Sequence, residues 1–94
     1  MRLTSAETTV IRTLLSHIDP SGEIYLFGSC ADDNRKGGDI DIFFQASKHI
    51  DFKEKLLLQH QLTVGCDTRV DLLIKNPGDR EQHIHTIARM GVKL

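Results

Sequence analysis

The fold of this chain is decided by residues 24–44, which read IYLFGSCADDNRKGGDIDIFF. A first apolar run ends at Gly28 and Ser29, a polar loop follows, and a second apolar run begins at Asp39. Alternate side chains of a strand share a face, so Asp39 and Asp41 project from one face of the second run and its apolar residues from the other. The pattern predicts two strands that bring paired acids beside a glycine turn.

Paired acids at this spacing indicate a metal site. Asp39 and Asp41 lie one pleat repeat apart, roughly 6 to 7 Å along the backbone. Like charges at that separation repel by about 2 to 3 kcal/mol at an effective dielectric near 20, and a divalent cation relieves the repulsion. Carboxylate oxygens suit Mg²⁺, which proteins commonly hold together with substrate phosphates. The plain alternative is a pair of solvated acids at the edge of a sheet.

The residues around the acids favour a nucleoside triphosphate as the substrate. Gly28 lets the backbone approach a ligand closely, and Ser29 offers a hydroxyl for its phosphates. Arg35 and Lys36 in the loop are candidates to reach the same phosphates. Two ordinary features would also explain these residues, namely a strand-ending turn at Gly28-Ser29 and a solvated basic loop.

The rest of the chain alternates helices and strands. Hydrophobic spacing and capping residues predict three helices, at residues 5–18, 52–62 and from an Asp79 cap to residue 90. Three strands are expected at residues 23–27, 39–44 and 69–74. Leucines 56, 57 and 58 are expected in the core, with Ile84, Ile87 and Ala88 as the apolar stripe of the last helix. His83 and His85 are expected to be solvated or to contact a partner.

Asp71 is a third acid, and it interrupts the otherwise apolar strand at residues 69–74. That strand is expected to lie beside the strand that carries Asp39 and Asp41. Three carboxylates around one point fit a two-metal phosphoryl-transfer site. Taken alone, a single acid in a short strand is more often just an exposed position.

The combination of Gly28-Ser29, Asp39-Ile40-Asp41 and a later Asp71 resembles the DNA polymerase beta-like nucleotidyltransferase superfamily. The short chain resembles the minimal nucleotidyltransferases, which act as antitoxins to HEPN-domain toxins. The resemblance implies an α/β (α+β) fold with a three-stranded mixed sheet and packed helices. The family often has arginine and serine where this chain has Cys30 and Gly38.

The resemblance also implies a reaction. AMP would pass from ATP to a hydroxyl, a tyrosine in related pairs, on a HEPN-domain partner in a hetero-oligomer. Asp39 and Asp41 would hold two Mg²⁺ ions, and Asp71 would help to hold the ion nearer the attacking hydroxyl. Two alternatives remain open: a domain that neutralises its partner by binding alone, and a small-molecule nucleotidyltransferase.

Composition limits the other possibilities. A chain of 94 residues with 39% hydrophobic and 27% charged residues predicts a single globular domain, residues 1–94. The net charge of −1 gives no electrostatic basis for strong nucleic-acid binding by the chain itself. Two cysteines without a metal-binding spacing predict reduced thiols in a cytoplasmic protein, and no stretch predicts a membrane span.

Overall fold

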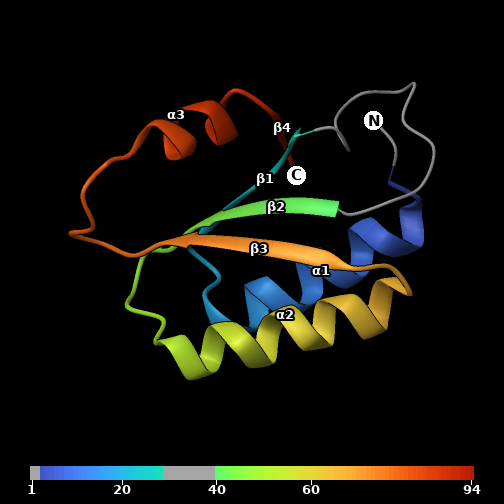
Figure 1. The fold of residues 1–94 in the computed structure, drawn as a ribbon. Helices are drawn as coiled ribbons and strands as arrows, with labels where there is room; N and C mark the ends of the chain where they lie inside the picture. Colours follow the sequence, from blue (N-terminus) through green and yellow to red (C-terminus); the bar gives the residue numbers. More distant parts are fainter. Residues whose placement is uncertain (1–2, 29–39) are drawn as a thin grey trace.

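A computed structural model describes residues 3–28 and 40–94 of the chain (Figure 1). Helices and strands follow one another in the order α1 (Ser5–Ile18), β1 (Glu23–Phe27), β2 (Ile40–Gln45), α2 (Phe52–Cys66), β3 (Val70–Lys75), α3 (His83–Arg89) and β4 (Val92–Lys93). Among these described residues, none of the helices has the length and hydropathy needed to span a bilayer.

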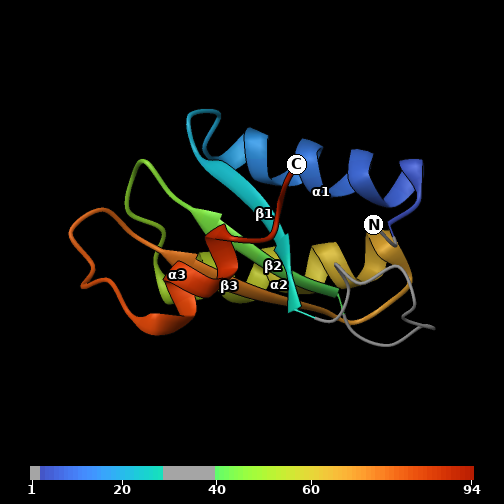
Figure 2. The same cartoon turned by 90° about the horizontal axis from the view of Figure 1, so that it is seen from above.

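The strands form one mixed sheet in the order β3-β2-β1-β4. β1 pairs antiparallel with β2 and with β4, whereas β2 and β3 are parallel. Viewed from above, β2 lies between β1 and β3 (Figure 2). The predicted mixed sheet and the pairing of the strands that carry Asp41 and Asp71 are therefore confirmed.

The predicted strand count was one too low. β4 consists of Val92 and Lys93 alone, which is too short to show a periodic sequence pattern. Gly91 precedes it, and a Cβ there would overlap the Leu26 carbonyl oxygen and lie 3.1 Å from the Phe27 Cα. Gly91 thus permits the close backbone approach that adds β4 to the edge of β1.

The sheet separates two layers of helices (Figure 1). α1 and α2 cover one face, where alternate strand residues meet them in a continuous core. α1 begins with a capping box in which the Thr4 hydroxyl accepts from the Glu7 N–H and the Glu7 carboxylate accepts from the Thr4 N–H. The fully buried, largest side chains are Ile11, Leu15, Leu26, Ile42, Phe43, Phe44, Leu62 and Val70.

α2 is longer than predicted and presents a different face to the core. It continues through Gly65 to Cys66 because α1 packs against that turn, where a Cβ on Gly65 would lie 2.7 Å from Val10 Cγ1. Leu56 and Leu57 are 51% and 57% exposed. Successive residues on a helix turn by about 100°, so of three consecutive leucines only Leu58 faces the sheet.

α3 also departs from the prediction. It begins at His83, and Asp79 instead accepts a hydrogen bond from the Asn76 N–H in the preceding turn. Ile84 and Ile87 are exposed, so they are not a buried stripe. His85 is buried rather than solvated, and it stacks on Phe43 at a centroid distance of 5.5 Å. This aromatic contact, which helical periodicity does not reveal, helps to attach α3 to the second face of the sheet.

Asp19, which is buried at the end of α1, makes the fold sensitive to acid. Burial acts to raise the pKa of its carboxyl, but hydrogen bonds from the Ser47 hydroxyl and N–H and from the Ser21 N–H outweigh it. The pKa therefore lies below its ordinary value of 3.8. Because the folded pKa is the lower one, this stabilisation is complete above the unfolded pKa and is lost as the pH falls through the folded pKa.

We therefore expect Asp19→Asn to lower the free energy of unfolding at neutral pH by about 1 to 3 kcal/mol, since a buried donor loses its anionic acceptor. Urea unfolding at pH 7 and at pH 3 would measure the effect. The gap between wild type and variant should narrow at the lower pH. A gap of the same size at both pH values would contradict the role given to the Asp19 charge.

Candidate active site

Two acids meet on the face of the sheet opposite α1 and α2. β2 and β3 are parallel and in register, so the Cα of Asp41 lies opposite that of Asp71. Neighbouring strands are about 4.8 Å apart, and paired residues project from the same face. Ile42 and Leu72, the next residues along, are buried in the core on the other side. The strand geometry thus brings together the two acids, which are 30 residues apart in the sequence.

Side chains of α2 hold β3 in this position. β3 is one of the two edge strands of the described sheet, and its outward N–H groups would otherwise be available to pair with another strand. The Thr63 hydroxyl accepts a hydrogen bond of 3.1 Å from the Val70 N–H, and the Gln59 side chain accepts one of 3.0 Å from the Leu72 N–H. These bonds flank Asp71 on both sides and fix the strand that carries it.

Gly28, directly after β1, lies against one of these acids, Asp41. Phe27, the last residue of β1, pairs with Asp41, so the chain leaves the sheet directly beside the Asp41 carboxylate. Gly28 has a φ of +69°, which favours glycine. A Cβ at this position would overlap Oδ2 of Asp41 and lie 3.1 Å from its Cγ. Because Gly28 has no Cβ, the Asp41 carboxylate can occupy this space.

The electrostatics of the site centre on Asp71 and Arg69. The Asp41 and Asp71 carboxylates carry like charges on paired residues of neighbouring strands, so they repel each other. The Arg69 guanidinium lies against Asp71, with Nε 3.3 Å from Oδ1. Sequence reasoning missed Arg69, although the alternation of a strand places residues 69 and 71 on one face. The pair is partly exposed, and an exposed ion pair contributes little to stability.

Four of the predicted site residues lie outside the described residues, namely Ser29, Arg35, Lys36 and Asp39. Of the predicted set, the structure brings together Gly28, Asp41 and Asp71. Within residues 3–28 and 40–94 no cluster of three potential metal ligands occurs. The two described acids nevertheless suit a hard divalent cation, because both present carboxylate oxygens on the same exposed face of the sheet.

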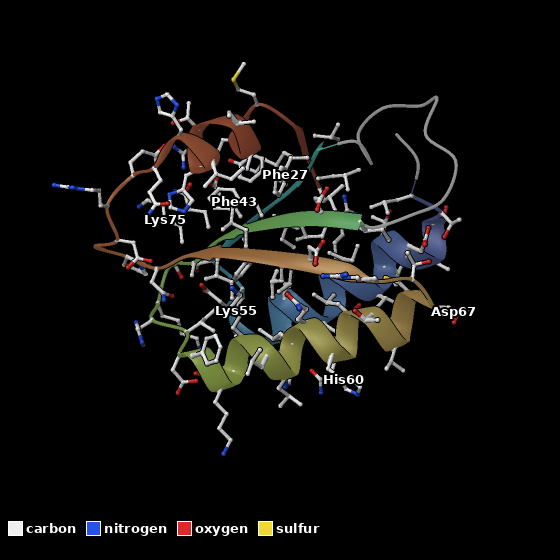
Figure 3. The ribbon with its side chains drawn as sticks, in the orientation of Figure 1. Phe27, Phe43, Lys55, His60, Asp67 and Lys75 are labelled. Atoms are coloured by element: carbon white, nitrogen blue, oxygen red, sulfur yellow. The ribbon has the colours of Figure 1, made fainter. Side chains whose placement is uncertain are left out.

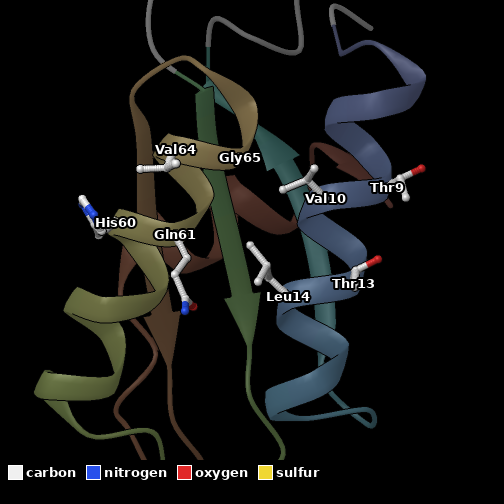
Figure 4. Close-up of a pocket in the computed structure, with 8 residues that line it drawn as sticks. All are labelled: Thr9, Val10, Thr13, Leu14, His60, Gln61, Val64 and Gly65. Carbon is white, nitrogen blue, oxygen red and sulfur yellow. The ribbon is translucent and has the colours of Figure 1, made fainter.

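A separate groove lies on the far side of the sheet, between α1 and α2 (Figure 4). It has a volume of about 510 Å³, and its lining includes Val10, Leu14 and Val64. The lining contains no acidic residue and no lysine or arginine. The groove therefore lacks the charged groups that a metal–phosphate site needs, in contrast to the face that carries Asp41 and Asp71.

The face that carries the acids also carries apolar residues. Phe27 and Phe43 lie on the α3 side of the sheet (Figure 3). Phe43 contacts the Tyr25 ring at a centroid distance of 5.9 Å, and the Arg89 guanidinium lies 5.9 Å from the centre of the Phe43 ring. Arg89 also donates to the Gln45 side chain at 3.0 Å. α3 thus covers the end of this face that holds Gln45, while the acids stand at the opposite end of β2 and β3.

Comparison with protein families supplies the deciding observation. Residues 10–94 match the family model described as polymerase beta, nucleotidyltransferase. The chain belongs to this nucleotidyltransferase family. The described residues form a four-stranded mixed sheet with three helices, which is the nucleotidyltransferase fold. This confirms the fold class and the family resemblance inferred from the sequence.

Solved structures similar to this nucleotidyltransferase domain come from toxin–antitoxin pairs, and the similar chain is the MntA-type antitoxin. One is a MntA–HpeT complex with two aspartates mutated to glutamate, at 32% identity and a TM-score of 0.61, covering 72% of this chain and 55% of that chain. Another is a toxin–antitoxin complex with AMP-PNP, at 33% identity and a TM-score of 0.61, covering 72% and 56%.

A further structure is a tri-AMPylated HEPN toxin of Shewanella oneidensis in complex with its MNT antitoxin. The identity is 31% and the TM-score 0.59, with 79% of this chain and 56% of that chain covered. The chain thus spans little more than half the length of the structures it matches. A comparison with curated protein sequences gives no match.

Proposed function

We propose that this nucleotidyltransferase domain is a Mg²⁺-dependent antitoxin that moves AMP from ATP to a hydroxyl of a HEPN-domain toxin. The observation that carries the proposal is the in-register placement of Asp41 and Asp71 on one face of the sheet, with Gly28 at the Asp41 carboxylate. The similar structures support the finer assignment, since one contains AMP-PNP and another an AMPylated HEPN toxin.

The proposed roles of the acids are those that the family resemblance implies. Asp39 and Asp41 would hold two Mg²⁺ ions, and Asp71 would help to hold the one nearer the acceptor. When bound, Mg²⁺ neutralises phosphate charge and makes the acceptor hydroxyl more acidic. Asp71 would aid removal of the hydroxyl proton. The acceptor oxygen then bonds to the α-phosphorus of ATP, and the bond from that phosphorus to the bridging oxygen breaks to release pyrophosphate.

Residues of this chain would also bind and orient the donor. Gly28 and Ser29 would bind the phosphates at the end of β1, with Arg35 and Lys36 reaching them from the loop. Positioning and electrostatic neutralisation supply most of the acceleration in phosphoryl chemistry. We propose that the reaction takes place in the cytoplasm. It would occur in a hetero-oligomer with the toxin, because the acceptor hydroxyl belongs to another chain.

Label transfer tests this function. The domain, Mg²⁺ and each of the four nucleoside triphosphates labelled at the α-phosphate are incubated with a HEPN-domain protein encoded beside it. We expect ATP to label the HEPN-domain protein and EDTA to prevent the labelling. Neutralisation of the toxin without any label would identify a domain that acts by binding alone. Label on a small molecule instead would identify a small-molecule nucleotidyltransferase.

A further inference from the structure

Arg69 stands directly beside the acids and has no role in the reaction described so far. It lies directly before β3 and two residues before Asp71, and its Nε is 3.3 Å from Oδ1 of Asp71. Its side chain is 69% exposed, so it is not held in place by the core. The contact therefore places a cation on a carboxylate that the proposed function assigns to a metal.

The guanidinium and a divalent cation would compete for this carboxylate. In the absence of metal, Arg69 offsets the repulsion between Asp71 and the neighbouring Asp41. A divalent cation at Asp71 would take over that role and would repel the guanidinium next to it. The Arg69 side chain is long and mostly exposed, so its movement away from Asp71 would leave the buried core in place.

We propose that Arg69 is a positioning residue that neutralises Asp71 in the metal-free protein and is displaced from it when a divalent cation binds. This inference rests on the proposed function, since it takes Asp71 as a metal ligand. Arg69 then weakens metal binding, and by linkage the bound metal weakens the contact between Arg69 and Asp71 by the same factor. The free energy of an exposed ion pair corresponds to a change of about 1.4- to 5-fold in an equilibrium constant, here the affinity for the metal.

Mn²⁺ binding to the full chain without nucleotide tests the inference, with free Mn²⁺ measured by electron paramagnetic resonance. We expect Arg69→Gln to bind Mn²⁺ about 1.4- to 5-fold more tightly than wild type, and Arg69→Lys to return the affinity towards the wild-type value because it restores the cation. The difference in Mn²⁺ affinity between wild type and Arg69→Gln should shrink as the salt concentration rises, since salt screens exposed charges.

Lys93→Gln is the matched control, because Lys93 forms another exposed ion pair, 2.9 Å from Glu23, at the opposite edge of the sheet. It removes one positive charge and should leave Mn²⁺ affinity unchanged. Equal affinity of wild type and Arg69→Gln, or equal tightening by Lys93→Gln, would overturn the role of Arg69 while leaving the metal site in place. If wild type itself does not bind Mn²⁺, or if Asp71→Asn binds it equally well, the proposed function fails instead.

Discussion

Asp41→Asn is expected to lower AMP transfer by about 1000-fold, which corresponds to about 4 kcal/mol of lost transition-state stabilisation. The substitution keeps the shape of the side chain but removes the charge that would hold both metal ions. Asp41 faces away from the core, so the sheet should remain intact. Rates of label transfer from ATP to the HEPN-domain partner would measure the loss.

Asp79→Asn provides the control for this variant. Asp79 lies in the turn after β3, at the end of that strand remote from Asp71, and an asparagine oxygen can still accept from the Asn76 N–H. It should transfer AMP at the wild-type rate. Thermal unfolding should show that both variants are folded. Mg²⁺ with an ATP analogue should raise the melting temperature of wild type and of Asp79→Asn, but not that of Asp41→Asn. Undiminished transfer by Asp41→Asn would show that Asp41 is not a catalytic residue.

Gly28→Ala is expected to reduce the rate of AMP transfer by about 100-fold, because displacing a catalytic group by about 1 Å can lower a reaction rate by that factor. The added methyl group would overlap Oδ2 of Asp41, so the carboxylate must move. The positive φ of Gly28 also makes alanine unfavourable by about 1 to 2 kcal/mol, independently of the site. Transfer rates and urea unfolding would separate the two effects.

Gly78→Ala is the matched control for Gly28→Ala. Gly78 has a φ of +87°, but a Cβ there would meet nothing within 4 Å. It should lose stability as Gly28→Ala does and retain its transfer activity. If the two alanine variants transfer AMP equally well, the contact between Gly28 and the Asp41 carboxylate has no part in catalysis.

The site could be anticipated from sequence where the chemistry follows strand alternation. In residues 40–44 an acid stands between apolar residues. Because Ile40 and Ile42 face the core, strand alternation places the Asp41 side chain on the opposite face of the sheet. Asp71 follows the same rule in β3. The family resemblance supplied the direction of the strands, since short apolar strands do not by themselves distinguish parallel from antiparallel pairing.

Features that depend on tertiary contacts could not be anticipated in the same way. β4 exists because Gly91 allows two residues to reach the edge of β1. His85 is buried because Phe43 offers it an aromatic surface, a contact between residues 42 positions apart. The register that sets Asp41 against Asp71 likewise depends on Thr63 and Gln59 of α2 binding β3 from outside.

The central claim is that Asp41 and Asp71 together hold a divalent cation against the phosphates of a nucleotide. A crystal structure with Mn²⁺ and a non-hydrolysable ATP analogue, using the anomalous signal of manganese, tests it most directly. We predict manganese bound by carboxylate oxygens of both residues, at about the 2.0 to 2.2 Å typical of small hard cations. Manganese and nucleotide bound elsewhere, with Asp71 still paired to Arg69, would contradict the claim.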